Sequence, residues 1–239
     1  MKFQKANIQN LMSKNSFKVL RPGINTTFQD LGRDNLYHVG LPFSGAIDKR
    51  NFLIANSIIS NNEDDAVLEF AYQGPLLEFS GSQTSIVITG NVNFKIIKKD
   101  TSEIKGECYR TYDLNNKDCL DIISTEKSVY GYLSVKGGFQ LDKFCNSYST
   151  TVRAEIGPND GKKIEVGQTI ILNAFDSSIK KSLEYFNSKI EFIRVIKGTN
   201  FDYFSEDSIK DFTSKDFTVS KLTDRMGMRL NGPKIKNLN

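Results

Sequence analysis

The segment SIVITG, residues 85–90, decides which fold is predicted, because its side chains are apolar on both faces of the strand that it would form. Such a strand lies at the centre of a sheet or in the wall of a barrel. TIIL at residues 169–172 has the same character. β-Branched or alternating runs predict further strands at residues 17–20, 76–79, 93–97, 119–123, 132–135 and 192–196. The sequence therefore predicts a mainly β protein.

Two segments are predicted to be helical. Asp48 is a suitable N-cap for a helix whose apolar residues recur at helical spacing between residues 52 and 59. Ser60, Asn61 and Asn62 end this pattern. The second helix is expected over residues 177–188, inside a polar and charged connector.

The composition is that of an ordinary globular protein. The chain carries 32 basic and 28 acidic residues, a net charge of +4, and its basic pairs stand beside acidic or polar neighbours. Nucleic-acid binders concentrate basic residues on one face, so we expect no nucleic-acid binding. No apolar run is long enough to span a membrane. Residues 1–16 lack the apolar segment of a secretory signal, so we predict a cytoplasmic protein with a polar N-terminal extension.

The sequence predicts neither a metal site nor a recognisable nucleotide pocket. Cys108, Cys119 and Cys145 are odd in number and lack the spacing of metal ligands, so we expect reduced thiols. GPNDGKK at residues 157–163 differs from a phosphate-binding loop in the spacing of its glycines. It also lacks a Ser or Thr after the lysine.

The connector suggests a domain boundary. After it, FIRVIKG at residues 192–198 echoes FKVLRPG at residues 17–23, which hints at a duplicated lobe. We therefore divide the chain into an extension at residues 1–16, a first lobe at 17–188 and the start of a second lobe at 189–239.

The stretch QDLGRDNLYHVGLPFSGAIDKRNFLIAN, residues 29–56, is the candidate site. Arg33 offers a fork of donors to carboxylate or phosphate, and the helix after Asp48 begins with amide groups that attract negative charge. A long ordered loop dense in polar groups is usually functional. The alternative is structural: Asp48 is only a cap, Arg33 and Asp30 only fix the loop, and Asn56 is a buried amide.

His38 is the chain's one histidine, and we expect it at a strand edge. A triad would also need a positioned nucleophile and an orienting carboxylate, and the sequence contains no G-x-S-x-G motif. We therefore predict no catalytic role for His38.

Several separated pieces of the sequence resemble one protein family. They are TTFQDLGR (26–33), GLPFSGAID (40–48), LIANSIISN (53–61), AVLEFAYQGPLLEF (66–79), ITG (88–90), YGYLSVKGGF (130–139), SYST (147–150) and DRMGMRLNGP (224–233). Their order and spread make the match more specific than any one motif. The chain resembles the urea amidolyase-related family, also called allophanate hydrolase subunit 2, which includes biotin-dependent carboxyltransferases and the C subunit of 5-oxoprolinase.

The resemblance implies two cyclophilin-like β-barrel lobes with the substrate site between them. Relatives continue beyond DRMGMRLNGP, so we expect a cyclophilin-like first lobe followed by an incomplete second one. Two positions depart from the family pattern. Tyr148 stands where relatives have an arginine, and IGPNDGKK at residues 156–163 replaces a glycine-rich element that ends in arginine. Substrate contacts made through those positions would be changed.

The resemblance implies three functions. The favoured one is a subunit of a heteromeric, ATP-dependent amidohydrolase that opens a small cyclic amide, as in 5-oxoproline to glutamate. A second is carboxyl transfer from carboxybiotin to urea or a similar amide. A third is a non-catalytic regulator that binds a partner subunit, because some relatives antagonise a kinase inhibitor. In the first reading, cognate partner subunits complete the complex and ATP is bound in it. The sequence does not identify which subunit binds the ATP.

The family position assigns roles to residues. Arg33, Asp48 and Glu69 are the predicted catalytic residues: Arg33 stabilises negative charge, and Asp48 or Glu69 handles the proton. The predicted substrate-binding residues are Gln29, Asp30, Ser44, Gly45, Asn56, Asp224 and Arg225.

Overall fold

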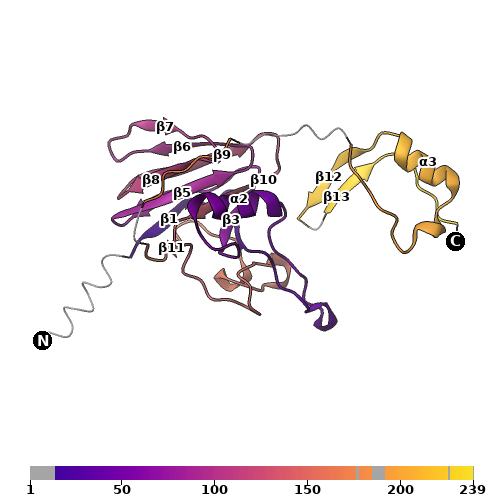
Figure 1. The fold of residues 1–239 in the computed structure, drawn as a ribbon, viewed down its shortest axis with the longest axis horizontal. Coiled ribbons are helices and arrows are strands. Elements are labelled where there is room, and N and C mark those ends of the chain that lie inside the picture. The colour runs from indigo at the N-terminus through magenta and orange to yellow at the C-terminus, as the bar shows by residue number, and fades with distance from the viewer. Residues whose placement is uncertain (1–13, 176–177, 185–191, 226, 239) are drawn as a thin grey trace, which may run out of the picture. The chain divides into compact units, whose positions relative to one another are not determined.

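The computed structural model describes residues 14–175, 178–184, 192–225 and 227–238. The chain divides into two compact units, Met1–Tyr185 (unit 1) and Phe186–Asn239 (unit 2). Each unit is described by itself (Figure 1).

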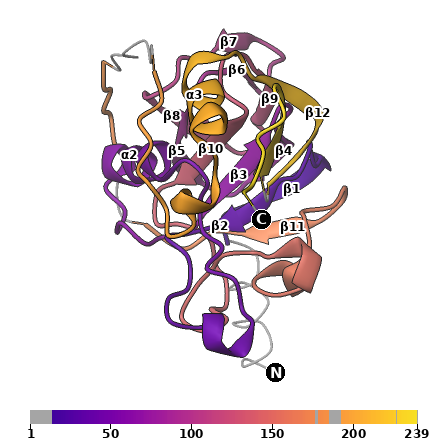
Figure 2. The same ribbon diagram turned by 90° about the vertical axis from the view of Figure 1, so that its right-hand side faces the viewer.

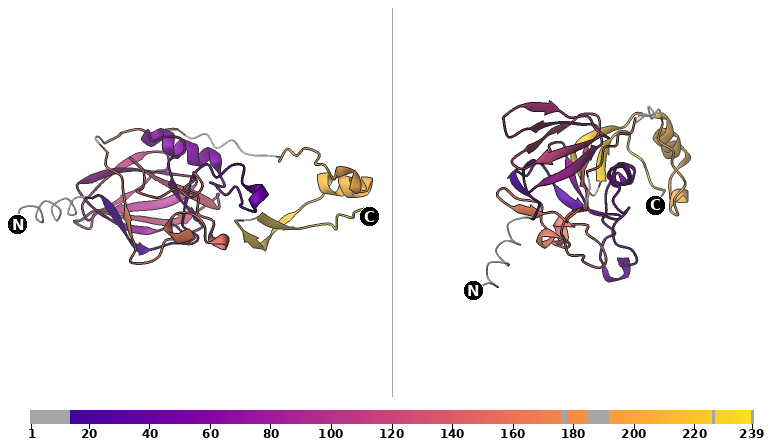
Figure 3. Two further views of the ribbon diagram at one scale, coloured as in Figure 1. Left: turned by 90° about the horizontal axis from the view of Figure 1, so that it is seen from below. Right: turned by 60° about the vertical axis from the view of Figure 1, so that its left-hand side comes forward.

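Unit 1 contains two antiparallel sheets (Figures 1 and 3). The first has the strand order β11-β1-β4-β9-β6-β7, and the second has the order β2-β3-β10-β5-β8. The strands of the first sheet are β1 (Ser16–Arg21), β4 (Leu76–Ser80), β6 (Val92–Ile97), β7 (Glu103–Lys105), β9 (Cys119–Thr125) and β11 (Thr169–Ile171). Those of the second are β2 (Thr27–Gln29), β3 (Val67–Ala71), β5 (Gln83–Thr89), β8 (Thr111–Asn115) and β10 (Tyr130–Val135). The predicted mainly β class is confirmed.

The main core of unit 1 is built from alternating residues of both sheets. In the first sheet β4 and β6 alternate between buried and half-buried residues, as strands with one face on a core do. Phe17 and Phe79 are direct partners across β1 and β4, with their rings edge to face and 5.7 Å between centroids.

Strand β5 shows why SIVITG is apolar on both faces. Ile86 and Ile88 belong to the main core. Val87 points to the opposite face, where it packs with Ala55 and Ile59 of helix α2 (Lys49–Ile59). Figure 2 shows α2 beside β5 and β10. The second sheet is therefore covered on both faces, as the prediction of a central strand requires.

Helix α2 begins and ends as its sequence predicts. The carboxylate of Asp48 accepts a hydrogen bond from the backbone N–H of Asn51, the bond that defines an N-cap. At the other end Ser60 adopts a left-handed backbone with φ of 55°. The ammonium groups of Lys136 and Lys181 donate to the carbonyl and hydroxyl of Ser60, at 2.7 and 2.6 Å. These cations stabilise the negative end of the helix dipole.

The helix predicted over residues 177–188 is wrong for the part that the structure describes. Residues 178–184 run in a non-helical conformation along the outer edge of β8, and Ser182 forms an isolated antiparallel bridge with Arg110. The backbone N–H of Thr111 donates to the carbonyl of Lys181 at 2.9 Å. The open backbone groups of an edge strand outweigh the helical preference of a short polar segment. Residues 177 and 185–188 lie outside the described residues.

Three short 3-10 helices lie in the loops of unit 1: η1 (Tyr37–Val39), η2 (Val152–Ala154) and η3 (Asn159–Gly161). Cys108, Cys119 and Cys145 are free thiols, as predicted. Across the described ranges, no helix is both long and apolar enough to cross a membrane.

Unit 2 contains η4 (Phe201–Tyr203), α3 (Glu206–Ser214) and the antiparallel pair β12 (Thr218–Asp224) and β13 (Gly227–Asn231). The strand predicted at residues 192–196 is wrong, because residues 192–198 have no regular structure. Alternating apolar residues form a strand only when a neighbour satisfies their backbone groups. Of the unit 2 residues whose burial is described, only Ser208 is buried.

Candidate functional site

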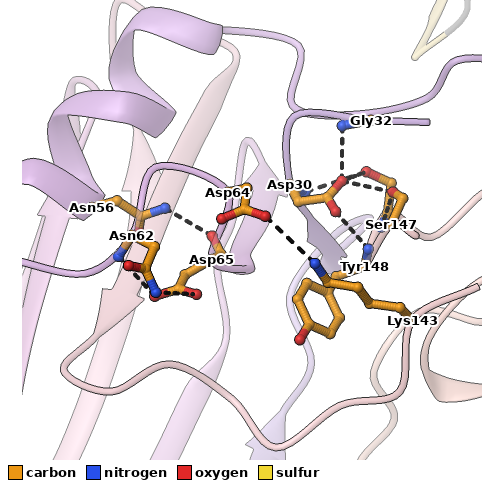
Figure 4. A network of polar contacts seen from close by, with 10 residues as sticks. Asp30, Gly32, Asn56, Asn62, Asp64, Asp65, Lys143, Ser147 and Tyr148 are labelled. Atoms are coloured by element: carbon orange, nitrogen blue, oxygen red, sulfur yellow. Dashed lines mark hydrogen bonds and ion pairs between the residues drawn. The ribbon is translucent and has the colours of Figure 1, made fainter. Parts of the chain in front are cut away.

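Asp30 is the centre of a buried polar network (Figure 4). Its Oδ1 accepts hydrogen bonds from the N–H of Gly32 and the hydroxyl of Ser147, both at 2.8 Å, and from the hydroxyl of Ser149. Its Oδ2 accepts from the N–H of Tyr148 at 2.6 Å. These bonds tie the loop after β2 to residues 147–149. A carboxylate that is 3% exposed and accepts this many hydrogen bonds fixes the shape of the loop.

Arg33 is buried next to this network. Its guanidinium donates to the carbonyl of Ser149 and, at 3.0 Å, to the hydroxyl of Thr151. Burial lowers the pKa of Arg33, while the charges of Asp30 and Cys145 oppose that shift. Its Nε has no hydrogen-bond partner in the described part of the chain. Arg33 therefore holds the loop and keeps one donor unused.

Ser44 and Arg33 both form hydrogen bonds with the hydroxyl of Thr151. The hydroxyl of Thr151 donates to the Ser44 Oγ at 3.0 Å, and the Ser44 hydroxyl lies 3.5 Å from the carbonyl of Thr150. Ser44 is half-buried and has a φ of 59°, a conformation that costs a non-glycine residue about 1 kcal/mol or more. Gly45 follows with a φ of 81° and is buried. Strained residues of this kind cluster at functional sites.

Gln29 completes this group from β2. Its side chain is fully buried, and its Nε2 donates to the hydroxyl of Thr27 and the carbonyl of Thr150, both at 2.9 Å. Its Oε1 accepts no hydrogen bond from any described residue. We call Gln29, Arg33, Ser44, Thr150 and Thr151 the Ser44 cluster. The cluster combines hydroxyl, amide and guanidinium groups, which suit a small polar molecule.

Asp48 lies three residues beyond Gly45 and is half-buried. Both of its carboxylate oxygens bond to Asn51, one to the backbone N–H at 3.0 Å and one to the side-chain amide at 2.7 Å. The capping role that the sequence allowed is therefore present. Asp48 is also less buried than Asp30, which is 3% exposed.

Glu69 and Asn56 are buried and occupied by protein groups. The Glu69 Oε2 accepts from the N–H of Ile47 at 2.9 Å and from the hydroxyl of Tyr132 at 3.0 Å. The Asn56 amide donates to the carbonyl of Asp65 at 2.8 Å (Figure 4). The Asn56 amide oxygen accepts from the hydroxyl of Ser134, also at 2.8 Å. The contacts of Asn56 join α2 to the following loop and to β10 and do not include the Ser44 cluster.

Asp224 and Arg225 belong to unit 2, which is described by itself. Asp224 ends β12 in unit 2, and its side chain lies outside the described residues. Arg225 follows it in the turn. His38 is exposed in η1 and not at a strand edge, because the N–H of Gly40 closes a tight turn onto the carbonyl of Tyr37.

The hydroxyl run at residues 147–151, SYSTT, was not assigned a role from sequence. Its residues are the partners of Asp30, Arg33, Ser44 and Gln29. A run rich in hydroxyl groups is a visible signal, but its partners lie more than a hundred residues away. Asn51 and Tyr132 were missed because their partners Tyr109 and Glu69 lie 58 and 63 residues away in the sequence.

Comparisons with known proteins give the family. A model of the carboxyltransferase domain, subdomain A and B, matches residues 39–239. Urea amidolyase of Saccharomyces cerevisiae is 28% identical over 237 residues, covering 92% of this chain and 12% of that protein. The C subunit of 5-oxoprolinase from Haemophilus influenzae is 27% identical over 211 residues, covering 88% of this chain and 66% of that protein. The chain thus spans less than two thirds of either relative.

The crystal structure of the Kluyveromyces lactis urea carboxylase has a TM-score of 0.80 to this chain at 26% identity. The match covers 99% of this chain and 23% of that one. This neighbour supports the cyclophilin-like, mainly β class that the resemblance implied. The chain belongs to the carboxyltransferase domain family, subdomain A and B.

Proposed function

We propose that this chain is a component of an ATP-dependent amidohydrolase that acts on a small cyclic amide of the 5-oxoproline type. The similarity to 5-oxoprolinase C subunits supports this reading. The C subunits from Haemophilus influenzae and Escherichia coli are 27% and 25% identical to this chain over 88% and 92% of its length.

The observation that carries the proposal is the hydroxyl of Ser44, which stands on a strained backbone and shares Thr151 as a hydrogen-bond partner with Arg33. The half-buried Asp48 follows four residues later. Opening an amide requires donors that polarise its carbonyl and a group that moves a proton. Ser44 supplies a donor, Arg33 supplies positive charge, and Asp48 supplies the base. Glu69 is not given this role, because it is only 1% exposed, whereas Asp48 is half-buried. ATP is expected in the assembled complex.

The test is an assay of the chain co-expressed with its cognate partner subunits. We expect ATP-dependent release of glutamate from 5-oxoproline. Asp48→Asn should lower kcat by about 100-fold or more, because general base catalysis contributes about 10²–10⁴-fold. Asparagine is as good an N-cap as aspartate, so the variant should remain folded. Asp142→Asn changes an exposed aspartate in the same way and is the control. An assembled wild-type complex without turnover would contradict the proposal and favour the regulator.

The family model and the urea carboxylase neighbour favour one alternative, carboxyl transfer from carboxybiotin to urea or a similar amide. The same donors would then stabilise the ureido oxyanion of carboxybiotin. Consumption of urea that depends on carboxybiotin, without glutamate release from 5-oxoproline, would select this alternative.

A further inference from the structure

The backbone of Asp48 is held by a buried pair of side chains on the second sheet. Its N–H donates to the hydroxyl oxygen of Tyr132 at 2.7 Å. That hydroxyl donates to the Oε2 of Glu69 at 3.0 Å, and the same oxygen accepts from the N–H of Ile47 at 2.9 Å. Tyr132 and Glu69 are direct partners across β10 and β3. The start of α2 is therefore attached to the sheet at two consecutive residues.

The carboxylate of Asp48 is held from the other side by Asn51. The Asn51 amide nitrogen donates to Oδ2 of Asp48 at 2.7 Å. The Asn51 amide oxygen accepts from the hydroxyl of Tyr109 at 2.8 Å, and that hydroxyl accepts from the N–H of Gly90 at 3.1 Å. Because Tyr109 occupies the oxygen, Asn51 can only present its NH₂ group to Asp48.

This arrangement exceeds what a helix cap requires. A cap needs one bond from an early backbone N–H to one side-chain oxygen. Here the second oxygen is also fixed, by an amide whose own orientation is fixed. Tyr132 is 0% and Tyr109 8% exposed, whereas Asp48 is half-buried. Two buried hydroxyl groups thus set the direction of a partly open carboxylate.

We propose that Tyr132 and Tyr109 are positioning residues that hold Asp48 for its role as a base. This rests on the proposed function, in which Asp48 moves a proton. Neither tyrosine touches substrate. Tyr132 fixes where the residue stands, and Tyr109, through Asn51, fixes how its carboxylate is turned. Burial and the charge of Glu69 raise the pKa of Tyr132, so its hydroxyl remains a donor at neutral pH.

The experiment compares Tyr132→Phe and Tyr109→Phe with Tyr112→Phe in the assembled complex. Tyr112 is the matched control, because its hydroxyl also accepts a backbone N–H, that of Glu107 at 2.9 Å, on β8. All three variants keep the ring, which is buried at Tyr132 and Tyr109 and half-buried at Tyr112. We expect kcat to fall about 10- to 100-fold in the two test variants, since a small misplacement of a reacting group can cost about 10²-fold. KM should change less than about 3-fold, and the control should keep its kcat.

Coupling to Asp48 separates positioning from general loss of structure. In an Asp48→Asn background, the tyrosine substitutions should lower the residual kcat no further, because residues that act as a unit are non-additive. Equal losses in the two backgrounds would overturn the proposal.

If the assembled wild-type complex shows no turnover, the proposed function is contradicted. Whether the two tyrosines position Asp48 can then still be tested without activity. Tyr132→Phe should then speed hydrogen exchange of the Asp48 amide, and Tyr109→Phe should shift the side-chain NH₂ resonances of Asn51. Tyr112→Phe should leave both unchanged. If the Asp48 and Asn51 signals are the same in all variants, the tyrosines do not position Asp48.

Discussion

Ser44 combines backbone strain with polar contacts. It has a φ of 59° and shares the hydroxyl of Thr151 with Arg33. Ser44 is half-buried. Strained residues cluster at active sites and ligand clamps, so the strain supports a functional role for Ser44 at the residue scale.

Two substitutions at Ser44 separate the strain from the hydroxyl. Ser44→Gly should be more stable than Ser44→Ala by about 1 kcal/mol, because glycine adopts a left-handed backbone without the steric cost. Both lack the hydroxyl, so both should lose activity to the same extent under the proposed function. Urea unfolding of the two variants measures the first difference. Equal stabilities would show that the backbone of Ser44 is unstrained.

Tyr132 should make stability fall at high pH. Burial and the charge of Glu69 raise its pKa in the folded chain. The contribution of Tyr132 to the free energy of unfolding is therefore fully present below about pH 10, the pKa of tyrosine in the unfolded chain. It is lost as the pH rises further, because only the unfolded chain then ionises this tyrosine. Between about pH 9 and pH 11, the free energy of unfolding should fall less in Tyr132→Phe than in the wild type. Parallel curves from urea unfolding at each pH would contradict this.

At the scale of elements, the site depends on two short segments, residues 30–33 and 43–46, that pack against each other. The N–H of Ala46 donates to the carbonyl of Asp30, and the N–H of Arg33 donates to that of Phe43, at 2.9 and 2.8 Å. Gly45 makes this approach possible, because a Cβ there would lie 2.8 Å from the carbonyl oxygen of Leu31. A loop of this kind has one packed conformation and not many.

Gly45→Ala should therefore disrupt the pairing of these segments. The substitution combines a left-handed φ of 81° with a clash against backbone, which cannot move as a flexible side chain could. We expect a loss of roughly 2–4 kcal/mol, the sum of the conformational cost and of overpacking. Gly40→Ala is the control, since its φ is 78° but no atom lies within 4 Å of a Cβ there. Similar losses in both variants would show that close packing adds nothing.

At the scale of the whole molecule, the two units differ in how much apolar surface they bury. The main core is drawn entirely from unit 1, between Phe17 and Leu172. Phe192, Ile193 and Ile196 of unit 2 are exposed by 72%, 85% and 96%. A two-stranded pair without a buried face is marginal in water.

A chain of residues 14–184 should fold alone, and a chain of residues 186–239 should not. The first keeps both sheets, α2 and the segment along β8. The second has no buried apolar side chain among those that the structure describes. Circular dichroism and thermal unfolding would distinguish a cooperative transition in the first from its absence in the second. A cooperative transition in residues 186–239 would contradict this account.

Much of unit 1 could be predicted from local patterns. The apolar alternation of β4 and β6, the two-faced apolarity of β5, and the cap and stripe of α2 all lie within a few residues of sequence. Hydrophobic periodicity reports burial directly, since apolar side chains leave water wherever the chain allows it. The dispersed motifs indicated the family separately, by their resemblance to known members. The sequence by itself therefore determined the class, most of the strands of unit 1, helix α2 and the family.

Only the tertiary structure decided which polar groups meet. Asp30 accepts hydrogen bonds from Ser147 and Ser149, more than a hundred residues away in the sequence. Glu69 accepts one from Tyr132, its direct partner on the neighbouring strand. A sequence shows that an aspartate or glutamate can accept hydrogen bonds, but not which donors surround it. The structural alternative thus holds for Asp30 and Asn56, while Ser44 and Asp48 stay partly open. The physical reason is that burial follows from local composition, whereas hydrogen bonds need specific geometry between distant segments.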